Sequence, residues 1–296
     1  MRRLATAIIL SAIALSVAAT PLRILYTNDL HLRFERLGGL ATAIRQEREA
    51  ARGSSLLLDA GDTWQDFRRP VAAVWGAESM VEWMNTVAYD AMAIGNHDLC
   101  WPTKKLEALS GLASFHLLCA NLTPITGLEA PFEPIAIVTS GSLRVLIIGG
   151  VTEELLPYHD LPWLVYSAPE ISMANEVARA GDDVDVIIGL VHLPVQDSIR
   201  LAEQIPEIDL WITGHSHEST EQPVQVGEAL VVQAGAFGGR LGVLDLDIDP
   251  ATGDVELEAH KQIAIETETS SLPREGLRSL LLVFAAMLAT AAIMLL

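Results

Sequence analysis

Short apolar runs alternate with stretches of helical spacing through the first half of the chain. The runs that we expect to form strands are residues 22–27, 55–58, 89–94 and 115–120. The stretches that place apolar side chains at helical intervals are residues 37–48, 71–87 and 102–109. Strands that alternate with helices predict an α/β fold in which the strands of this half pair in parallel.

The spacing changes after residue 124, where hairpins appear. Residues 135–138 and 143–148 flank Thr139-Ser140-Gly141-Ser142, which is typical of a turn between two strands. The other elements expected in this half are strands at residues 186–190, 208–213, 229–233, 243–248 and 255–265, and helices at residues 169–180 and 197–204. The hairpins predict a second, mixed sheet. Residues 21–268 contain no evident linker or repeat, so we expect them to form one domain.

Both ends of the chain are hydrophobic. At the first, Arg2 and Arg3 precede an uncharged run that ends in small residues, which predicts a signal peptide over residues 1–20. An uncleaved N-terminal anchor is the alternative. At the other end, the uncharged residues 279–296 are about long enough to cross a bilayer as a helix. We therefore expect a C-terminal transmembrane anchor over residues 277–296.

The two ends make opposing predictions about topology. Arg274 and Arg278 precede the expected anchor, and the positive-inside rule would place that side in the cytoplasm. A signal peptide would place it outside. We favour export, with the domain anchored on the extracytoplasmic side, because a tail with no following charge gives the rule little to act on. A lipid-anchor or sorting tail is a further alternative.

The formal net charge of -19 limits the class of partner. A chain this acidic should repel nucleic acid polymers, so we expect none as a partner. A small anionic substrate would need local positive charge, which bound cations could supply. The two cysteines, Cys100 and Cys119, are too few for a disulfide scaffold. We expect buried thiols, with a disulfide between them as the alternative.

Residues of the types that bind metals or act in catalysis follow five of the expected strands. They are Asp29, His31, Asp62, Asn96, His97, Asp98, His192, His215 and His217. Because ligand sites in α/β sheets lie at the carboxyl ends of the strands, these tips could converge. In Asp29-x-His31 and His215-x-His217 the spacing points both side chains the same way if the backbone is extended. One such residue alone would be read as a turn or structural residue, whereas five motifs indicate a metal site.

With these motifs in this order, residues 22–265 resemble the calcineurin-like metallophosphoesterases, specifically the catalytic domain of the 5′-nucleotidase family. The similarity extends through Gly38-Gly39-Leu40, Ala120-Asn121 and residues 233–246. The resemblance implies a four-layer α/β/β/α sandwich with two metal ions. It does not include the second domain with which the family's nucleotidases bind the base.

The resemblance also implies a division of the ligands between two ions. One ion would be held by Asp29, His31, Asp62 and His217, and the other by Asp62, Asn96, His192 and His215. Ligands of this mixture suit Mn, Zn, Fe or Mg. Two cations about 3.5–4 Å apart would activate a water to hydroxide and hold a phosphate ester for in-line attack.

The catalytic residues that we expect are His97 and Asp98. His97 would stabilise the transition state or protonate the leaving oxygen. Two positions depart from the family. Cys100 stands where the family has a carboxylate that orients the histidine, and Asp66 stands where the family commonly has glycine.

These features predict an exported, membrane-anchored phosphoesterase that hydrolyses nucleotides or other small phosphomonoesters or diesters. The first alternative is a hydrolase of the family's thiosulfohydrolase branch. The second is a non-catalytic metal-binding surface protein, which the cysteine at position 100 favours.

Overall fold

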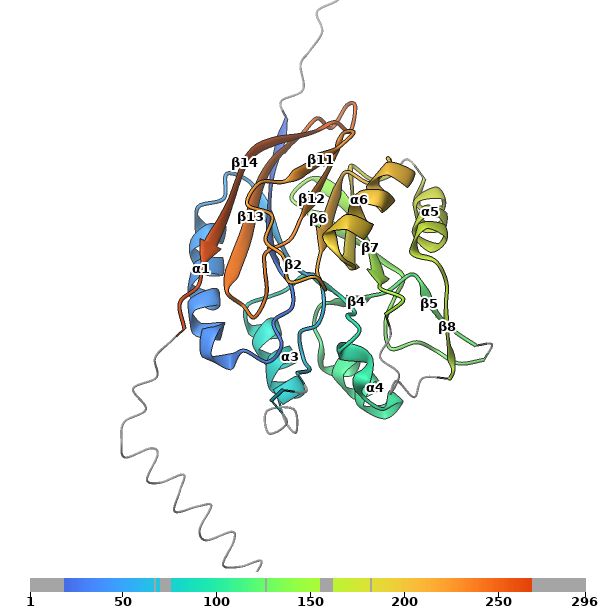
Figure 1. Ribbon diagram of the computed structural model, residues 1–296. Helices are drawn as coiled ribbons and strands as arrows, with labels where there is room; N and C mark the ends of the chain where they lie inside the picture. The colour runs from blue at the N-terminus through green and yellow to red at the C-terminus, as the bar shows by residue number, and fades with distance from the viewer. Residues whose placement is uncertain are drawn as a thin grey trace, which may run out of the picture.

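The computed structural model describes residues 19–66, 68–69, 76–125, 127–154, 162–181 and 183–267 (Figure 1). Residues 1–18 of the expected signal peptide and the whole of the expected anchor at residues 277–296 lie outside these ranges. Within the described part of the chain, we find no helix that combines the length and the apolar character needed to cross a bilayer.

The first sheet has six strands in the order β14-β13-β1-β2-β3-β4. Its strands are β1 (Thr20–Thr27), β2 (Ser54–Asp59), β3 (Ala91–Ala93), β4 (His116–Leu118), β13 (Arg240–Ile248) and β14 (Val255–Ala264). Strands β1 to β4 are parallel, which confirms the prediction for the first half. The hairpin β13–β14 joins this sheet by antiparallel pairing with β1. The sequence pattern assigns the later hairpins to the second sheet, and for this hairpin that is wrong, because alternation does not specify a partner strand.

The second sheet has the order β11-β12-β10-β9-β7-β6. Its strands are β6 (Ile135–Ser140), β7 (Leu143–Val151), β9 (Val186–His192), β10 (Leu210–Thr213), β11 (Val224–Val226) and β12 (Ala229–Val232). Its two outer hairpins are antiparallel and its central strands are parallel, so the predicted mixed sheet is confirmed. A small separate sheet pairs β5 (Leu122–Pro124) with β8 (Leu164–Tyr166).

Helices cover the outer faces of the two sheets (Figure 1). The helices are α1 (Leu37–Glu49), α3 (Gly76–Thr86), α4 (Thr103–Leu112), α5 (Pro169–Ala180) and α6 (Val195–Gln204), with short 3-10 turns η1 (Phe34–Arg36) and η2 (Asp98–Cys100). Between the sheets lies an apolar layer that includes Ile24, Leu58, Ile147 and Ile188. Separate apolar clusters lie under α1, α3 and α4 and under α5 and α6. The predicted four-layer α/β/β/α sandwich is therefore confirmed.

The stacked sheets bring their loops together at one edge. His192, at the end of β9, hydrogen-bonds through Nδ1 to the Ala60 carbonyl after β2 at 2.7 Å. The loop after β10 approaches the same carbonyl so closely that a Cβ atom on Gly214 would lie 2.8 Å from it. Only glycine allows this approach. The carboxyl ends of β1, β2 and β3 therefore face those of β9 and β10.

Asp209, just before β10, provides a test of the second sheet. Its carboxylate accepts the Ile187 backbone N–H at 2.8 Å, and burial raises its pKa to about 6. The folded state therefore holds this proton more tightly than the unfolded state. The free energy of unfolding therefore falls as pH rises from about 4 to about 6, because ionising Asp209 costs more in the folded state, and the loss persists above pH 6.

Asp209→Asn should keep the acceptor for Ile187 and remove the buried charge. We expect the free energy of unfolding at pH 7.5 to rise by about 1–3 kcal/mol, with little change at pH 4. Urea unfolding at both pH values measures this. Asp185→Asn is the control, because Asp185 also accepts one backbone N–H, from Arg144. An equal effect of Asp209→Asn on the free energy of unfolding at both pH values would contradict a raised pKa for Asp209.

Candidate metal centre

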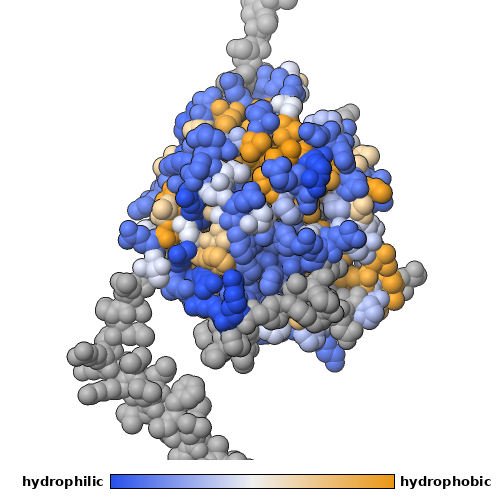
Figure 2. All heavy atoms as spheres, viewed as in Figure 1, coloured by the Kyte–Doolittle hydropathy of each residue, from blue (hydrophilic) through white to orange (hydrophobic). Residues whose placement is uncertain are grey.

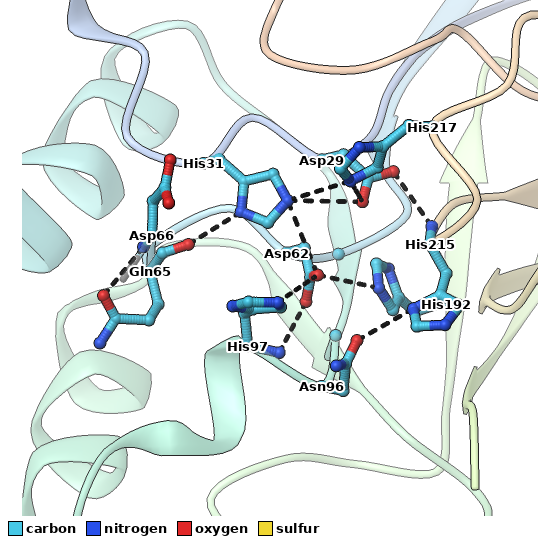
Figure 3. Close-up of polar contacts among 12 residues, drawn as sticks. Asp29, His31, Asp62, Gln65, Asp66, Asn96, His97, His192, His215 and His217 are labelled. Carbon is cyan, nitrogen blue, oxygen red and sulfur yellow. Dashed lines mark hydrogen bonds and ion pairs between the residues drawn. The ribbon is translucent and has the colours of Figure 1, made fainter. Parts of the chain in front are cut away.

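Seven side chains that follow strand tips meet at one place (Figure 3). They are the seven predicted metal ligands, Asp29, His31, Asp62, Asn96, His192, His215 and His217. The loops after β1, β2 and β3 carry four of them, and the ends of β9 and β10 carry three. Each sheet thus contributes ligands to one centre.

Asp29, His31 and His217 form the first cluster. Asp29 Oδ1 lies 3.2 Å from His217 Nε2 and 3.7 Å from His31 Nε2, and the two imidazole nitrogens lie 3.3 Å apart. Asp29 Oδ1 is buried and accepts no hydrogen bond from the described part of the chain. Because a buried carboxylate oxygen without a donor is costly, a cation among these atoms would satisfy all three groups. The cluster therefore fits a metal ion.

Asp62, His192 and His215 form the second cluster, with Asn96 beside it. His192 Nε2 lies 3.2 Å from Asp62 Oδ2, and His215 Nδ1 lies 3.1 Å from Asn96 Oδ1. Asp62 Oδ2 also lies 3.8 Å from Nε2 of His31, a member of the first cluster. Oxygen and imidazole ligands in this mixture suit borderline to hard divalent cations. Both clusters fit a cation, and Asp62 is placed to bridge them.

The backbone at the centre is strained. The five ligands with positive φ are Asp29 (51°), His31 (46°), Asp62 (57°), His215 (70°) and His217 (59°). Residues with a side chain adopt this left-handed conformation only where their surroundings hold it, typically at functional sites. The interpretation of the two ligand pairs as extended backbone is therefore wrong. Both members of each pair reach the centre through left-handed turns.

Backbone carbonyls orient two of the buried imidazoles. His31 Nδ1 lies 2.9 Å from the Gln65 carbonyl oxygen, and His192 Nδ1 lies 2.7 Å from that of Ala60. A carbonyl accepts, so each Nδ1 carries the proton and each Nε2 is left as the metal-binding atom. Both Nε2 atoms face the carboxylates of the centre (Figure 3).

Charge in the centre is concentrated on Asp62 and the histidines around it. Burial lowers the pKa of His192, but the Asp62 carboxylate outweighs burial and raises it to about 10. Burial raises the pKa of Asp62, but His192 and then His31 outweigh it and hold that pKa below its ordinary range. An imidazole must be neutral to bind a metal. A cation held by Asp62 and His192 would therefore displace a proton from this pair.

His97 lies beside the two clusters. Its backbone N–H donates to Asp62 Oδ1 at 2.8 Å, and its ring stands edge-on to that of His31, with 5.1 Å between the centroids. The side chain is 27% exposed, so it reaches the solvent side of the centre. Burial lowers its pKa. His97, His31 and Asp62 also lie close enough together to share a cation.

Asp98, which we expect as the second catalytic residue, is fully buried. Its carboxylate accepts the backbone N–H groups of Asp62, Thr63, Trp64 and Gly95 at 2.8–3.0 Å. The three bonds from Asp62, Thr63 and Trp64 join the loop after β2 to the loop after β3. The geometry favours a positioning role for Asp98, acting through Asp62, over contact with a substrate.

Cys100 is a thiol where the resemblance predicts an orienting carboxylate. Its Sγ lies 3.7 Å from the Asn96 carbonyl oxygen. Burial, together with the Asp98 and Asp62 carboxylates, raises its pKa to about 12. Cys100 therefore stays neutral and cannot replace a carboxylate. Neither cysteine is in a disulfide, which confirms the expectation of thiols, and Cys119 is buried as expected, whereas Cys100 is only half-buried.

Three residues contact the ligands although the sequence pattern assigns them no role. Asn28 Nδ2 donates at 2.7 Å to the carboxylate of the residue that follows it. Glu154 Oε2 lies 3.1 Å from His215 Nε2, and the Phe237 ring lies 4.9 Å from that of His217. Glu154 could have been found, because β7 is one more parallel strand that ends at this edge. No comparable pattern in the sequence indicates that Phe237 lies at the centre.

Asp98→Asn tests the positioning role. The asparagine NH2 group replaces one carboxylate oxygen, so two of the four backbone N–H donors lose their acceptor. We expect the free energy of unfolding to fall by about 2–4 kcal/mol. Urea unfolding measures this. Asp90→Asn is the control, because Asp90 accepts a single backbone N–H, from Leu57, which an amide oxygen can still accept. An equal fall in the free energy of unfolding of the two variants would contradict the positioning role of Asp98.

Comparison with known proteins places this geometry in a family. The family model described as "Calcineurin-like phosphoesterase" matches residues 22–219. An uncharacterized metallophosphoesterase of Bacillus subtilis, YunD, is 30% identical over 77% of this chain and 50% of its own length. A snake venom 5′-nucleotidase of Crotalus adamanteus is 32% identical over 80% of this chain and 47% of its own length. This chain thus spans about half the length of the curated relatives it matches.

Among solved structures, a 5′-nucleotidase precursor of Thermus thermophilus has a similar fold. The TM-score is 0.73 at 24% identity, over 91% of this chain and 59% of that chain. The family match, the two ligand clusters and the four-layer sandwich agree with one another. The chain belongs to the calcineurin-like phosphoesterase family.

Proposed function

We propose that this protein hydrolyses small phosphate esters at a dinuclear metal centre. The observation that carries the proposal is the arrangement of two ligand clusters on either side of Asp62. Family membership makes phosphoester hydrolysis the reaction class, with 5′-nucleotidases among the relatives. We further propose that the substrate is a nucleotide or another small phosphomonoester or diester, and that the cations are Mn, Zn, Fe or Mg.

Divalent cations at the two clusters would supply the Lewis acidity that phosphoester hydrolysis needs, and a nucleophilic water. The chain's own residues hold the geometry. Asp62 lies between the two clusters. The backbone N–H groups of Asp62 and Thr63 donate to the Asp98 carboxylate, and these hydrogen bonds hold Asp62 in place. The His97 imidazole lies at the exposed side of the centre, where it can donate a hydrogen bond to a phosphoryl oxygen or a proton to the leaving oxygen.

His97→Ala tests the catalytic assignment. We expect kcat on 4-nitrophenyl phosphate with Mn or Zn to fall by about a hundredfold or more, because the proton donor is lost. The variant should still bind two cations per chain, measured by elemental analysis after dialysis. His116→Ala, which changes an exposed histidine paired with Glu133, is the matched control.

Three other results would count against parts of this proposal. Absence of hydrolysis by the metal-loaded parent, on nitrophenyl phosphates and on nucleotides, would favour a non-catalytic metal-binding protein. Full activity in the presence of a chelator would exclude the metal mechanism. Loss of one cation from His97→Ala would make His97 a ligand.

We also propose that the domain is exported and held at a membrane by residues 277–296. The support is the sequence pattern of the two ends, which lie outside the described residues. Protease added to intact cells should then degrade the domain, whereas a cytoplasmic control protein survives. Protection of the domain until the cells are lysed would contradict this topology.

A further inference from the structure

Four arginines lie at the edge of the metal centre, two of them over the ring of Phe237. We call Arg33, Arg36, Arg68 and Arg69 the rim arginines. The guanidinium carbons of Arg33 and Arg68 lie 4.6 Å and 5.0 Å from the centre of the Phe237 ring. Both distances are within the range of cation–π contacts. Arg36 donates to the Phe237 carbonyl oxygen at 3.0 Å.

Phe237 connects the rim arginines to the metal ligands. Its ring lies 4.9 Å from the His217 ring and 5.5 Å from the His31 ring. Its backbone is left-handed, with φ 59°, and its N–H donates to the Asp29 carbonyl oxygen at 2.6 Å. A phenylalanine in this conformation is uncommon, and the surrounding structure must hold it there. The ring is therefore a fixed spacer between the ligands and the guanidinium groups.

The rim arginines outnumber the carboxylates that pair with them. Arg33 and Arg68 pair with Asp66, and Arg69 pairs with Glu35, in a chain whose net charge is -19. Among the described residues, Arg33 Nε has no hydrogen-bond partner. The carboxylates of the described residues thus leave the rim arginines incompletely neutralised.

Part of this charge is open to solvent. The Arg68 side chain is 60% exposed, and those of Arg69 and Arg33 are 30% and 23% exposed. Figure 2 shows strongly hydrophilic surface between α1 and α3, in the region of the loops that carry the rim arginines. Cation–π and ring–ring contacts each span about 5 Å, so the guanidiniums of Arg33 and Arg68 lie roughly 10 Å or less from the His217 ring. A molecule bound at the metal centre could span that distance.

We propose that the rim arginines form a second anion-binding subsite, which selects phosphate esters that carry a further anionic group. This inference rests on the proposed phosphoesterase function. The scissile phosphate occupies the metal centre, and a carboxylate or second phosphate of the same molecule lies against Arg68 and Arg33. Guanidinium groups suit this role because they bind carboxylate and phosphate oxygens with paired N–H donors.

Two substrates of nearly equal size test this subsite. Glycerol 3-phosphate and 3-phosphoglycerate differ in that the second carries a carboxylate in place of a hydroxymethyl group. We expect the metal-loaded full chain to hydrolyse 3-phosphoglycerate with a KM lower by about tenfold, since one charge-assisted contact has that size. The preference should shrink as salt rises, because the Arg68 side chain is exposed.

Arg68→Gln, and the double variant Arg33→Gln with Arg68→Gln, should raise KM for 3-phosphoglycerate towards that for glycerol 3-phosphate. They should leave kcat and the glycerol 3-phosphate KM within about twofold. Arg179→Gln is the matched control, because Arg179 is 71% exposed and pairs with Glu176 on α5. Arg68→Gln removes an exposed side chain, so it should fold even if the double variant does not.

The outcomes separate the two proposals. Hydrolysis of neither ester, nor of 4-nitrophenyl phosphate, would overturn the proposed function. Hydrolysis of both esters with equal KM, unaffected by Arg68→Gln, would overturn the subsite and leave the function standing. Equal loss of preference in Arg179→Gln would mean that overall charge, and not the rim arginines, selects the acid.

Discussion

The structure depends on one electrostatic constraint, the burial of the Asp62 carboxylate among imidazoles from both sheets. Asp62 Oδ2 lies 3.2 Å from His192 and 3.8 Å from His31, which belong to different sheets. A buried carboxylate needs compensating charge, and a proton or a cation can provide it. The high pKa of His192 is the protonic form of that compensation. A cation held by the same ligands would take the place of that proton.

The contacts around Asp62 hold its buried carboxylate and the neighbouring imidazoles in place. The two sheets stack so that the Ala60 carbonyl orients His192 across the layer boundary. Asp98 joins the loops after β2 and β3 through three backbone hydrogen bonds. Left-handed backbone at five ligands shows that the packed core stabilises conformations these residues would not adopt alone. The apolar layer between the sheets provides the rigidity that these strained turns require.

The charge distribution has a second consequence at the edge of the centre. The chain as a whole repels anions, yet the rim arginines lie next to the ligands, with Phe237 between them. Asp66, which stands where the family commonly has glycine, pairs with Arg33 and Arg68 and so sets their positions. Positive charge is therefore concentrated locally, on guanidinium groups beside the centre.

The sequence alone determined the strand tips and the residue types they carry. Alternation of apolar runs with helical spacing predicted the layers, and five motifs predicted the ligands, because each signal is contained in a few consecutive residues. The tertiary structure decided which strands pair, since β13 joins β1 across more than two hundred residues. It also decided that Asp98 faces backbone N–H groups, that the ligand turns are left-handed, and that Phe237 meets His31. These facts depend on contacts between distant segments, which no local pattern encodes.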